Sequence, residues 1–367
     1  MNSKERIRAL MRGELPDRVG CFDAPWPETR ARWHAEGLPA GVHANDFFEM
    51  DVRHLLRVDG SFGLPVTVEE EGDDYRIVRT ADGVLEKSWK GTGAPLTLEF
   101  AVKTRDDWNR LRDRLVPSRD RIAWGYYGDY GFEYVSGPFE KVKAACDACA
   151  TNDTTYLLAA FPDPFESFMG KLGDERMLMT MLTDPEWVAG MFDAHVTFCR
   201  GMTDLLMRHF RVDGVFLGGD LAYRNGMLFS PKVYRELVMP RHVAMISHFK
   251  SHGLDVIFHC DGDCREAIGM LIEAGIDALQ PLEVKAGLDV RELARIYGDR
   301  IAFVGNLDVR ALGGDADAVR AEVESKVRAA AEGRIRYVAH SDHSVPDTVS
   351  FRNYSLARQI VDDLGRY

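Results

Sequence analysis

Two histidines stand at the ends of short apolar runs, and each has a carboxylate close by. His259 closes the run DVIFH with Asp261 two residues later, and His343 follows the run IRYVA. Two imidazoles and a carboxylate form a common nitrogen and oxygen ligand set for zinc or ferrous iron. We therefore predict that His259, Asp261 and His343 bind a divalent metal. Three neighbours are candidates for a further ligand or for orienting the set: Cys260, Glu283 and Asp342.

The same residue types also suit a site without a metal. A cluster of histidines and aspartates can bind a substrate or transfer protons, with pKa values set by neighbouring carboxylates. The other histidines differ because they fall in segments with helical spacing, where we interpret them as surface or packing residues. They are His195, His209, His242, His248 and His252.

Polar residues able to bind a metal or move a proton end most of the other apolar runs as well. They are Asp163, Glu166, Asp220, Glu283, Asn306 and His340. Loops are polar in general, however, and such residues also cap helices. Asp289 and Asp308 each precede a helical stretch, so we interpret these two as caps.

The elements that must position these side chains follow a regular alternation. Seven short apolar runs (RVGCFD, TTYLLAAF, GVFLGGD, DVIFH, IDALQPLE, IAFVGN and IRYVAH) alternate with segments of helical spacing. Such alternation is typical of a parallel sheet. The length of 367 residues fits an α/β fold of the (β/α)8 TIM-barrel type with additions. In a barrel the strand ends meet at one face, which would gather the candidate residues. The position of the eighth strand stays open.

We predict one domain over residues 1–367, with residues 24–115 as an insertion of β-hairpin and helix after the first strand. The segment VTVEEEGDDYRIVRTADGVLEKSWKG alternates polar and apolar residues around Asp82 and Gly83. This pair is a frequent turn in β-hairpins.

Composition excludes several classes of protein. With 46 Lys and Arg against 58 Asp and Glu, the net charge is -12, which argues against a nucleic-acid partner. No apolar run approaches the ~20 residues of a membrane-spanning helix. We expect a cytoplasmic protein whose six cysteines are thiols. No G-x-G-x-x-G follows a strand and opens a helix, which removes a dinucleotide site. The oligomeric state stays open, with a homodimer among the alternatives.

The segments DVIFHCDGD, LIEAGIDALQPLEVKAGLDVRELARIYGDRIAFVGNLDVRAL and IRYVAHSDHSVPDTVSFRNYSLARQIV resemble the uroporphyrinogen decarboxylase superfamily of (β/α)8 barrels. The start, SKERIRALMRGELPDRV, is similar to the N-terminus of that superfamily. The resemblance covers most of the chain, with the middle third weakest. It implies the barrel fold, and an activity drawn from decarboxylases, zinc-dependent methyltransferases that exchange methyl groups with corrinoid proteins, and members without an assigned reaction.

Two departures place the chain nearer to the methyltransferases. The true decarboxylases carry an R-Q-A-G-R segment that holds the substrate carboxylates, whereas this chain has DAPWPETRARW there, with Arg30 and Arg32. The methyltransferases carry H-x-C and a later cysteine as zinc ligands. Here His259 keeps the histidine, while Asp261 and His343 stand at the cysteine positions. A shift of one residue would place Cys260 in the ligand set instead.

The resemblance therefore implies a methyltransferase that moves a methyl group between a small O- or N-methylated substrate and a corrinoid protein. Zinc or another divalent metal at His259, Asp261 and His343, or these residues alone, would stabilise charge on the leaving heteroatom. His343, oriented by Asp342, would donate a proton. The expected substrate contacts are Asp220, Glu283, Tyr223, Trp26 and Asn306.

Two alternatives remain beside this interpretation. One is a decarboxylase acting on a tetrapyrrole such as uroporphyrinogen, or on another carboxylic acid. The other is a non-catalytic binding or sensor protein, because a shared fold does not establish a reaction.

Overall fold

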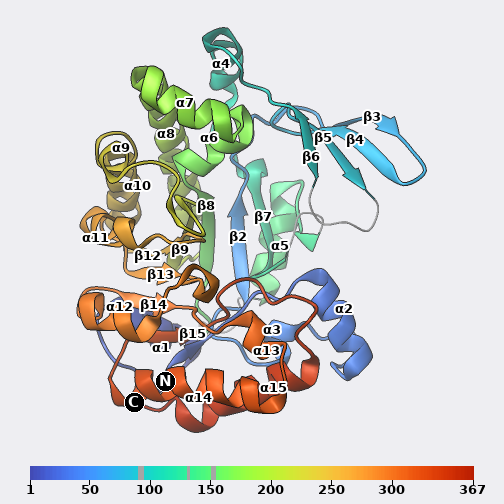
Figure 1. Cartoon of the computed structure of the whole chain (residues 1–367). Coiled ribbons are helices and arrows are strands. Elements are labelled where there is room, and N and C mark those ends of the chain that lie inside the picture. The colour runs from blue at the N-terminus through green and yellow to red at the C-terminus, as the bar shows by residue number, and fades with distance from the viewer. Residues whose placement is uncertain (90–94, 130–132, 150–153) are drawn as a thin grey trace.

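In the computed structural model, which describes residues 1–89, 95–129, 133–149 and 154–367, eight parallel strands form the curled sheet of a barrel (Figure 1). They are β1 (Gly20–Cys21), β2 (His54–Val58), β8 (Leu158–Pro162), β9 (Gly214–Gly218), β12 (Asp255–His259), β13 (Ala278–Gln280), β14 (Ala302–Val304) and β15 (Tyr337–Ala339). The order along the sheet is β1-β15-β14-β13-β12-β9-β8-β2, and β7 (Ile122–Tyr126) adds to β2 in antiparallel fashion. The predicted fold class is confirmed.

The seam between β1 and β2 is bridged by the residues just before β2. The backbone N–H of Asp51 donates to the carbonyl of Cys21 at 2.8 Å, and the N–H of Cys21 donates to Asp51 Oδ2 at 2.8 Å. The two ends of the parallel sheet are thereby joined, and the barrel is closed around its core.

All seven predicted strands are present, and β2 is the eighth. It pairs with β8 in parallel between Leu55 and Arg57. Its sequence, HLLRV, contains only three apolar residues and includes a charged one, so it lacks the continuous apolar run of a fully buried strand. The segment 24–115 therefore contributes a barrel strand in addition to its other elements.

Helices cover the outside of the barrel (Figure 1). Those that follow the chain around it are α1 (Ser3–Met11), α6 (Pro164–Leu172), α7 (Asp174–Thr183), α8 (Pro185–His209), α10 (Met239–Ser251), α11 (Arg265–Ala274), α12 (Val290–Tyr297), α14 (Ala316–Glu332) and α15 (Phe351–Leu364). Shorter or peripheral ones are α2 (Pro27–Glu36), α3 (Ala44–Phe47), α4 (Arg105–Leu111), α5 (Phe139–Cys149), α9 (Pro231–Val233) and α13 (Val309–Leu312).

Carboxylates at the strand ends start several of these helices. Asp163 accepts a hydrogen bond from the N–H of Glu166 at the start of α6, where Pro164 occupies the first turn. Asp289 and Asp308 cap α12 and α13, as we predicted. Such caps satisfy backbone N–H groups that lack a partner within the helix.

A separate antiparallel sheet of four strands projects from one side of the barrel (Figure 1). Its strands are β3 (Thr67–Glu71), β4 (Tyr75–Arg79), β5 (Leu85–Trp89) and β6 (Leu96–Glu99). The turn between β4 and β5 contains Asp82 and Gly83, and Gly83 has a φ of 79°, which favours glycine. The predicted hairpin is confirmed and is part of this larger sheet. We call β3 to β6 the accessory sheet. Two short strands, β10 (Ala222–Tyr223) and β11 (Gly226–Met227), form a small hairpin after β9.

No helix in the described part of the chain is long and apolar enough to cross a membrane.

Candidate active site

A cavity of about 1810 Å³ opens at the C-terminal ends of the barrel strands. Its walls come from β2, β8, β9, β12 and β13, from the loop after β15, and from the accessory sheet, which contributes Arg76 and Trp89. His259, Asp261 and His343 line it together with Trp26. The accessory sheet thus forms part of the entrance to the barrel mouth.

His259 is the last residue of β12 and is held between two kinds of partner. Its Nδ1 lies 2.5 Å from Oε1 of Gln280, the last residue of the neighbouring strand β13. Because an amide oxygen only accepts, Nδ1 carries a hydrogen and Nε2 faces the carboxylates of Asp220 and Asp261, at 3.5 and 3.9 Å. Burial would lower the pKa of His259, but the charges of Asp261 and Asp220 outweigh it and raise that pKa above its ordinary value.

Asp261 lies between the two histidines. Its Oδ2 is 3.9 Å from His259 Nε2 and 3.7 Å from His343 Nε2, and its backbone N–H donates to Asp220 Oδ1 at 2.9 Å. Its other oxygen, Oδ1, is buried and has no hydrogen-bond partner among the described residues. Burial raises the pKa of Asp261 even though His259 counteracts it. A buried acceptor without a donor is costly unless a ligand completes it.

His343 is the most accessible of the three, with 35% of its side chain exposed. Its ring packs edge-to-face against Trp26, with ring centroids 6.0 Å apart. This contact fixes one wall of the cavity beside Asp261 and leaves the imidazole within reach of a bound molecule.

The arrangement fits a divalent cation. Ligand atoms of Asp220, His259 and Asp261 lie within 4.8 Å of one another, and so do those of Asp261, Glu283 and His343. The two groups share Asp261, whose Oδ1 lacks a partner. Zinc and iron accept imidazole nitrogen and carboxylate oxygen in this way.

Glu166 adds a carboxyl group that the sequence placed among the polar residues at the strand ends, but that we did not include in the predicted site. It stands in the first turn of α6 and lines the cavity. Burial, followed by the charges of Asp220 and Asp163, raises the pKa of Glu166 to about 7. A carboxyl group with this pKa can hold and release a proton near neutrality. Its position after the run TTYLLAAF was the available signal, which did not distinguish it from a capping residue.

Two of the predicted site residues hold loops together instead of facing the cavity. We expected Asp342 to orient His343, but its Oδ2 accepts from the N–H of Val284 and its Oδ1 from the N–H of Val309. No hydrogen bond or ion pair joins Asp342 to His343, both of which the structure describes. That expectation was wrong, because the carboxylate satisfies backbone donors of two neighbouring loops.

Asn306 is likewise fully engaged inside the protein. Its amide donates to the carbonyls of Leu282 and Leu288, and its Oδ1 accepts from the N–H of Val290. With all these bonds made and no exposure, it has no group left for a substrate. The predicted substrate contact at Asn306 is therefore wrong.

The remaining predicted residues lie around the site in different ways. Glu283 is buried, accepts from the N–H of Gly262 at 3.0 Å and pairs with Lys285 at 2.6 Å. Cys260 is buried behind the cluster, where its Sγ accepts from the N–H of Leu221. A hydrogen bond with Cys264, together with burial, raises the pKa of Cys260 and keeps it a thiol. The side chain of Tyr223 is half exposed and lies outside the residues that line the cavity.

Comparisons with known proteins agree with this architecture. The family model named uroporphyrinogen decarboxylase (URO-D) matches residues 165–364. A solved structure, a methyltransferase from Methanosarcina mazei, aligns over 99% of each chain with a TM-score of 0.62 at 13% identity, which shows a shared fold. A Xaa-Pro dipeptidase with bound methionine aligns over 85% of this chain and 86% of its own at 11% identity, but its TM-score of 0.31 does not indicate a common fold. No curated protein matches the sequence.

Proposed function

Since the chain belongs to the uroporphyrinogen decarboxylase family, we propose that it is a methyltransferase of that family. It moves a methyl group between a small O- or N-methylated substrate and a corrinoid carried by a partner protein. The observation that carries this proposal is the set His259, Asp261 and His343 at the barrel mouth, whose donors are nitrogen and oxygen. Such donors suit the polarisation of an oxygen or nitrogen better than the activation of a thiol.

The chain's own residues handle the charge and the proton in this reaction. When the bond from carbon to the heteroatom breaks, its electron pair stays on the heteroatom, which then takes up a proton. Glu166 is a suitable donor because its pKa of about 7 keeps it partly protonated at neutral pH. Where no metal is bound, His259, with its raised pKa, is a second donor through Nε2. The electron pair for the new bond to the methyl group would come from a reduced corrinoid on the partner protein.

A divalent metal would be held by His259, Asp261 and His343, with Asp220 or Glu283 as a further ligand. When bound, it would act as a Lewis acid toward the heteroatom of the substrate. Gln280 would keep Nδ1 of His259 occupied, so that Nε2 faces the ligand position.

The charges around the cavity favour a substrate with few carboxylates. Eight of the lining residues are Asp or Glu and three are Lys or Arg. Arg30 is buried against Glu133 and the carbonyl of Pro25, and Arg32 pairs with Glu36, so neither faces the cavity. A uroporphyrinogen would meet like charge here. Decarboxylation of another carboxylic acid is the second candidate, because the matching family model carries that name.

One experiment separates these candidates. The purified protein is mixed with a reduced corrinoid protein and a panel of methoxy compounds, methylamines and carboxylic acids, and the corrinoid absorption spectrum is followed together with release of carbon dioxide. A spectral change that depends on the substrate supports methyl transfer. Carbon dioxide without a spectral change would replace it with the decarboxylase.

Variants connect the reaction to the site. His259→Ala and His343→Ala should each lower turnover by about 10²–10⁴-fold, whereas His34→Ala, on the exposed side of α2, should leave it unchanged. Elemental analysis of the same proteins should show metal that is lost in both site variants. Unchanged turnover in both variants would reject the assigned site.

A further inference from the structure

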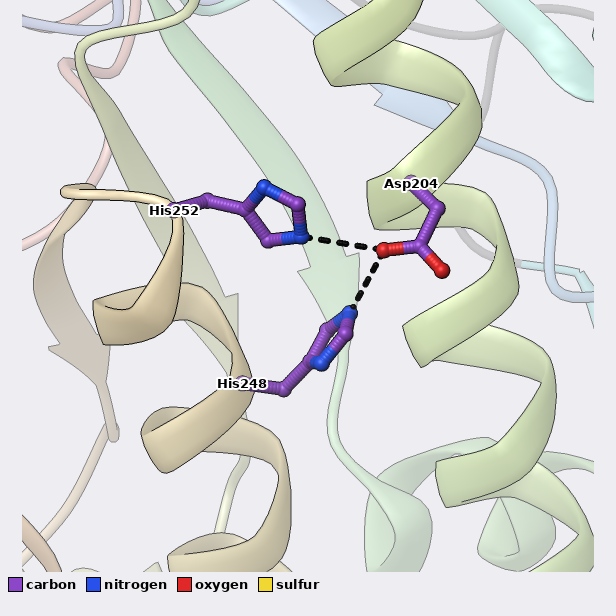
Figure 2. A group of neighbouring side chains, drawn as sticks. All are labelled: Asp204, His248 and His252. Carbon is purple, nitrogen blue, oxygen red and sulfur yellow. Dashed lines mark hydrogen bonds and ion pairs between the residues drawn. The ribbon is translucent and has the colours of Figure 1, made fainter.

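Two histidines and an aspartate converge on the outside of the barrel, away from the cavity. Asp204 belongs to α8, His248 to α10, and His252 follows directly after the end of α10. Nε2 of His248 lies 3.0 Å from Asp204 Oδ1, and Nε2 of His252 lies 2.9 Å from the same oxygen. Figure 2 shows both rings directed at this single carboxylate. We had interpreted His248 and His252 as surface or packing residues.

The cluster lies at the opposite end of the barrel from the candidate active site. The C-terminal end of α8 leads into the start of β9, and that of α10 leads into the start of β12. The cavity opens at the other ends of these strands, and none of the three residues lines it. Any ligand bound here is therefore separate from the chemistry of His259, Asp261 and His343.

The spacing of the three side chains suits a metal ion. Residues four apart on a helix project from the same face, and the rings of His248 and His252 lie with centroids 5.0 Å apart. One ligand atom from each of the three residues lies within 4.8 Å of the other two. Zinc binds such atoms at ~2.0–2.2 Å, so small side-chain rotations would bring all three to bonding distance.

The cluster is accessible to an ion from solution. The side chains of His248, His252 and Asp204 are 15%, 29% and 43% exposed. Burial alone would raise the pKa of Asp204, but hydrogen bonds and charge from His252 and His248 lower it, so the carboxylate is ionised. Water can complete the coordination shell on the open side, as it does where zinc has three protein ligands.

The two helices that carry the cluster are already fixed relative to each other. Arg241 on α10 pairs with both carboxylate oxygens of Asp193 on α8, at 2.8 and 2.9 Å. Asp193 precedes Asp204 on α8 by the same number of residues as Arg241 precedes His252. The ion pair between Arg241 and Asp193 thus already aligns α8 with α10, which lowers the entropy cost of bringing the ligands together when an ion binds.

From this convergence of two imidazoles and a carboxylate across two helices, we propose a second metal site at Asp204, His248 and His252. It takes a borderline divalent cation of the zinc class, which favours imidazole together with carboxylate. The ion replaces the two hydrogen bonds to Asp204 and joins α8 to α10. This site depends on no part of the proposed methyl transfer.

The test uses the full chain carrying His259→Ala and His343→Ala, so that binding at the barrel mouth does not hide the second site. Zinc is titrated into this protein by calorimetry, and we expect one equivalent to bind. His248→Gln and His252→Gln are then added separately. Glutamine can still donate a hydrogen bond to Asp204 but is a poor zinc ligand, so each change should weaken binding at least about tenfold, the loss seen even when a residue that only orients a ligand is removed. His34→Gln is the matched control and should bind zinc unchanged.

A spectroscopic measurement identifies the donors independently of affinity. With copper(II) as the probe, electron paramagnetic resonance of the same protein should show coupling to two imidazole nitrogens, reduced to one in each glutamine variant. Circular dichroism confirms that the variants are folded. Absence of bound zinc, or equal zinc affinity in the parent and both glutamine variants, would overturn the site and leave a hydrogen-bonded cluster.

Discussion

At the scale of single residues, polar side chains at the strand ends divide into two kinds. His259, Asp261 and His343 face the cavity, and Asp261 Oδ1 has no partner among the described residues. Asp342 and Asn306 stand at equivalent places in the sequence but bond to backbone groups of neighbouring loops. A sequence shows residue types and not their bonding partners, so both kinds of residue gave the same signal.

The burial of Glu166 should make the free energy of unfolding depend on pH. Its pKa is raised from the ordinary 4.5 to about 7. Between these values the folded state retains a proton that the unfolded chain has released, so the free energy of unfolding falls as the pH rises through this interval. Glu166→Gln removes the effect, and relative to wild type the variant should gain about 1–3 kcal/mol between pH 5 and pH 8.

Urea unfolding at the two pH values measures this difference. Glu140→Gln on α5 replaces an exposed glutamate and should show no such gain. If the Glu166 variant differs from wild type by the same amount at both pH values, the carboxyl group does not titrate near 7, and its role as a proton donor falls as well.

Asp342 allows the loop-holding role to be tested against the catalytic one. Asp342→Ala leaves two partly buried backbone N–H groups without their acceptor, which should lower the free energy of unfolding by about 1–3 kcal/mol. Thermal unfolding measures it. Metal content should stay at the wild-type level, since the carboxylate of Asp342 bonds to neither histidine ring of the site, His259 or His343. Loss of metal without loss of stability would show instead that Asp342 takes part in metal binding.

At the scale of elements, continuous apolar runs predicted seven of the eight barrel strands. Such runs mark strands that are buried on both faces, and β12 is buried at its first four positions. We did not predict β2 from the sequence, because Arg57, which lines the cavity, interrupts its apolar run. The hairpin around Gly83 was predicted from its turn residues, whereas the position of the accessory sheet at the cavity depends on packing between distant segments that no local pattern describes.

The accessory sheet offers a prediction about substrate binding. Trp89 and Arg76 line the cavity but lie on β5 and β4, apart from the carboxylates and histidines of the barrel. Replacing either by alanine should raise KM several-fold and leave kcat nearly unchanged, because a contact made equally in ground state and transition state affects binding alone. Steady-state kinetics with the identified substrate measure this. A several-fold fall in kcat with KM unaltered would instead show that these residues act in the chemical step.

At the scale of the whole molecule, the chain and its cavity share an excess of acidic residues. The net charge of -12 argues against nucleic acid, and the excess of carboxylates extends into the cavity itself. The two proposed metal positions use part of this charge at opposite ends of the barrel. In the proposals above, acidic residues act as ligands and proton donors as well as surface groups.

Closure of the barrel depends on Asp51, and the integrity of the whole fold should depend on it too. Its buried carboxylate accepts from Arg6 at 2.7 Å, from Arg18 at 3.1 Å and from the N–H of Cys21 at 2.8 Å. Asp51→Ala leaves these donors buried without their acceptor, and should cost about 3–5 kcal/mol of the free energy of unfolding.

Asp17→Ala is the matched control: Asp17 also pairs with Arg6 but is 42% exposed, so its loss should cost about 1 kcal/mol or less. Chemical denaturation followed by tryptophan fluorescence and by circular dichroism should give one coincident transition for each protein, since the seam joins β1 and β2, the two ends of the parallel sheet, in one cooperative barrel. Equal losses for the two variants would mean that the seam is held by the strands alone and that Asp51 does not close it.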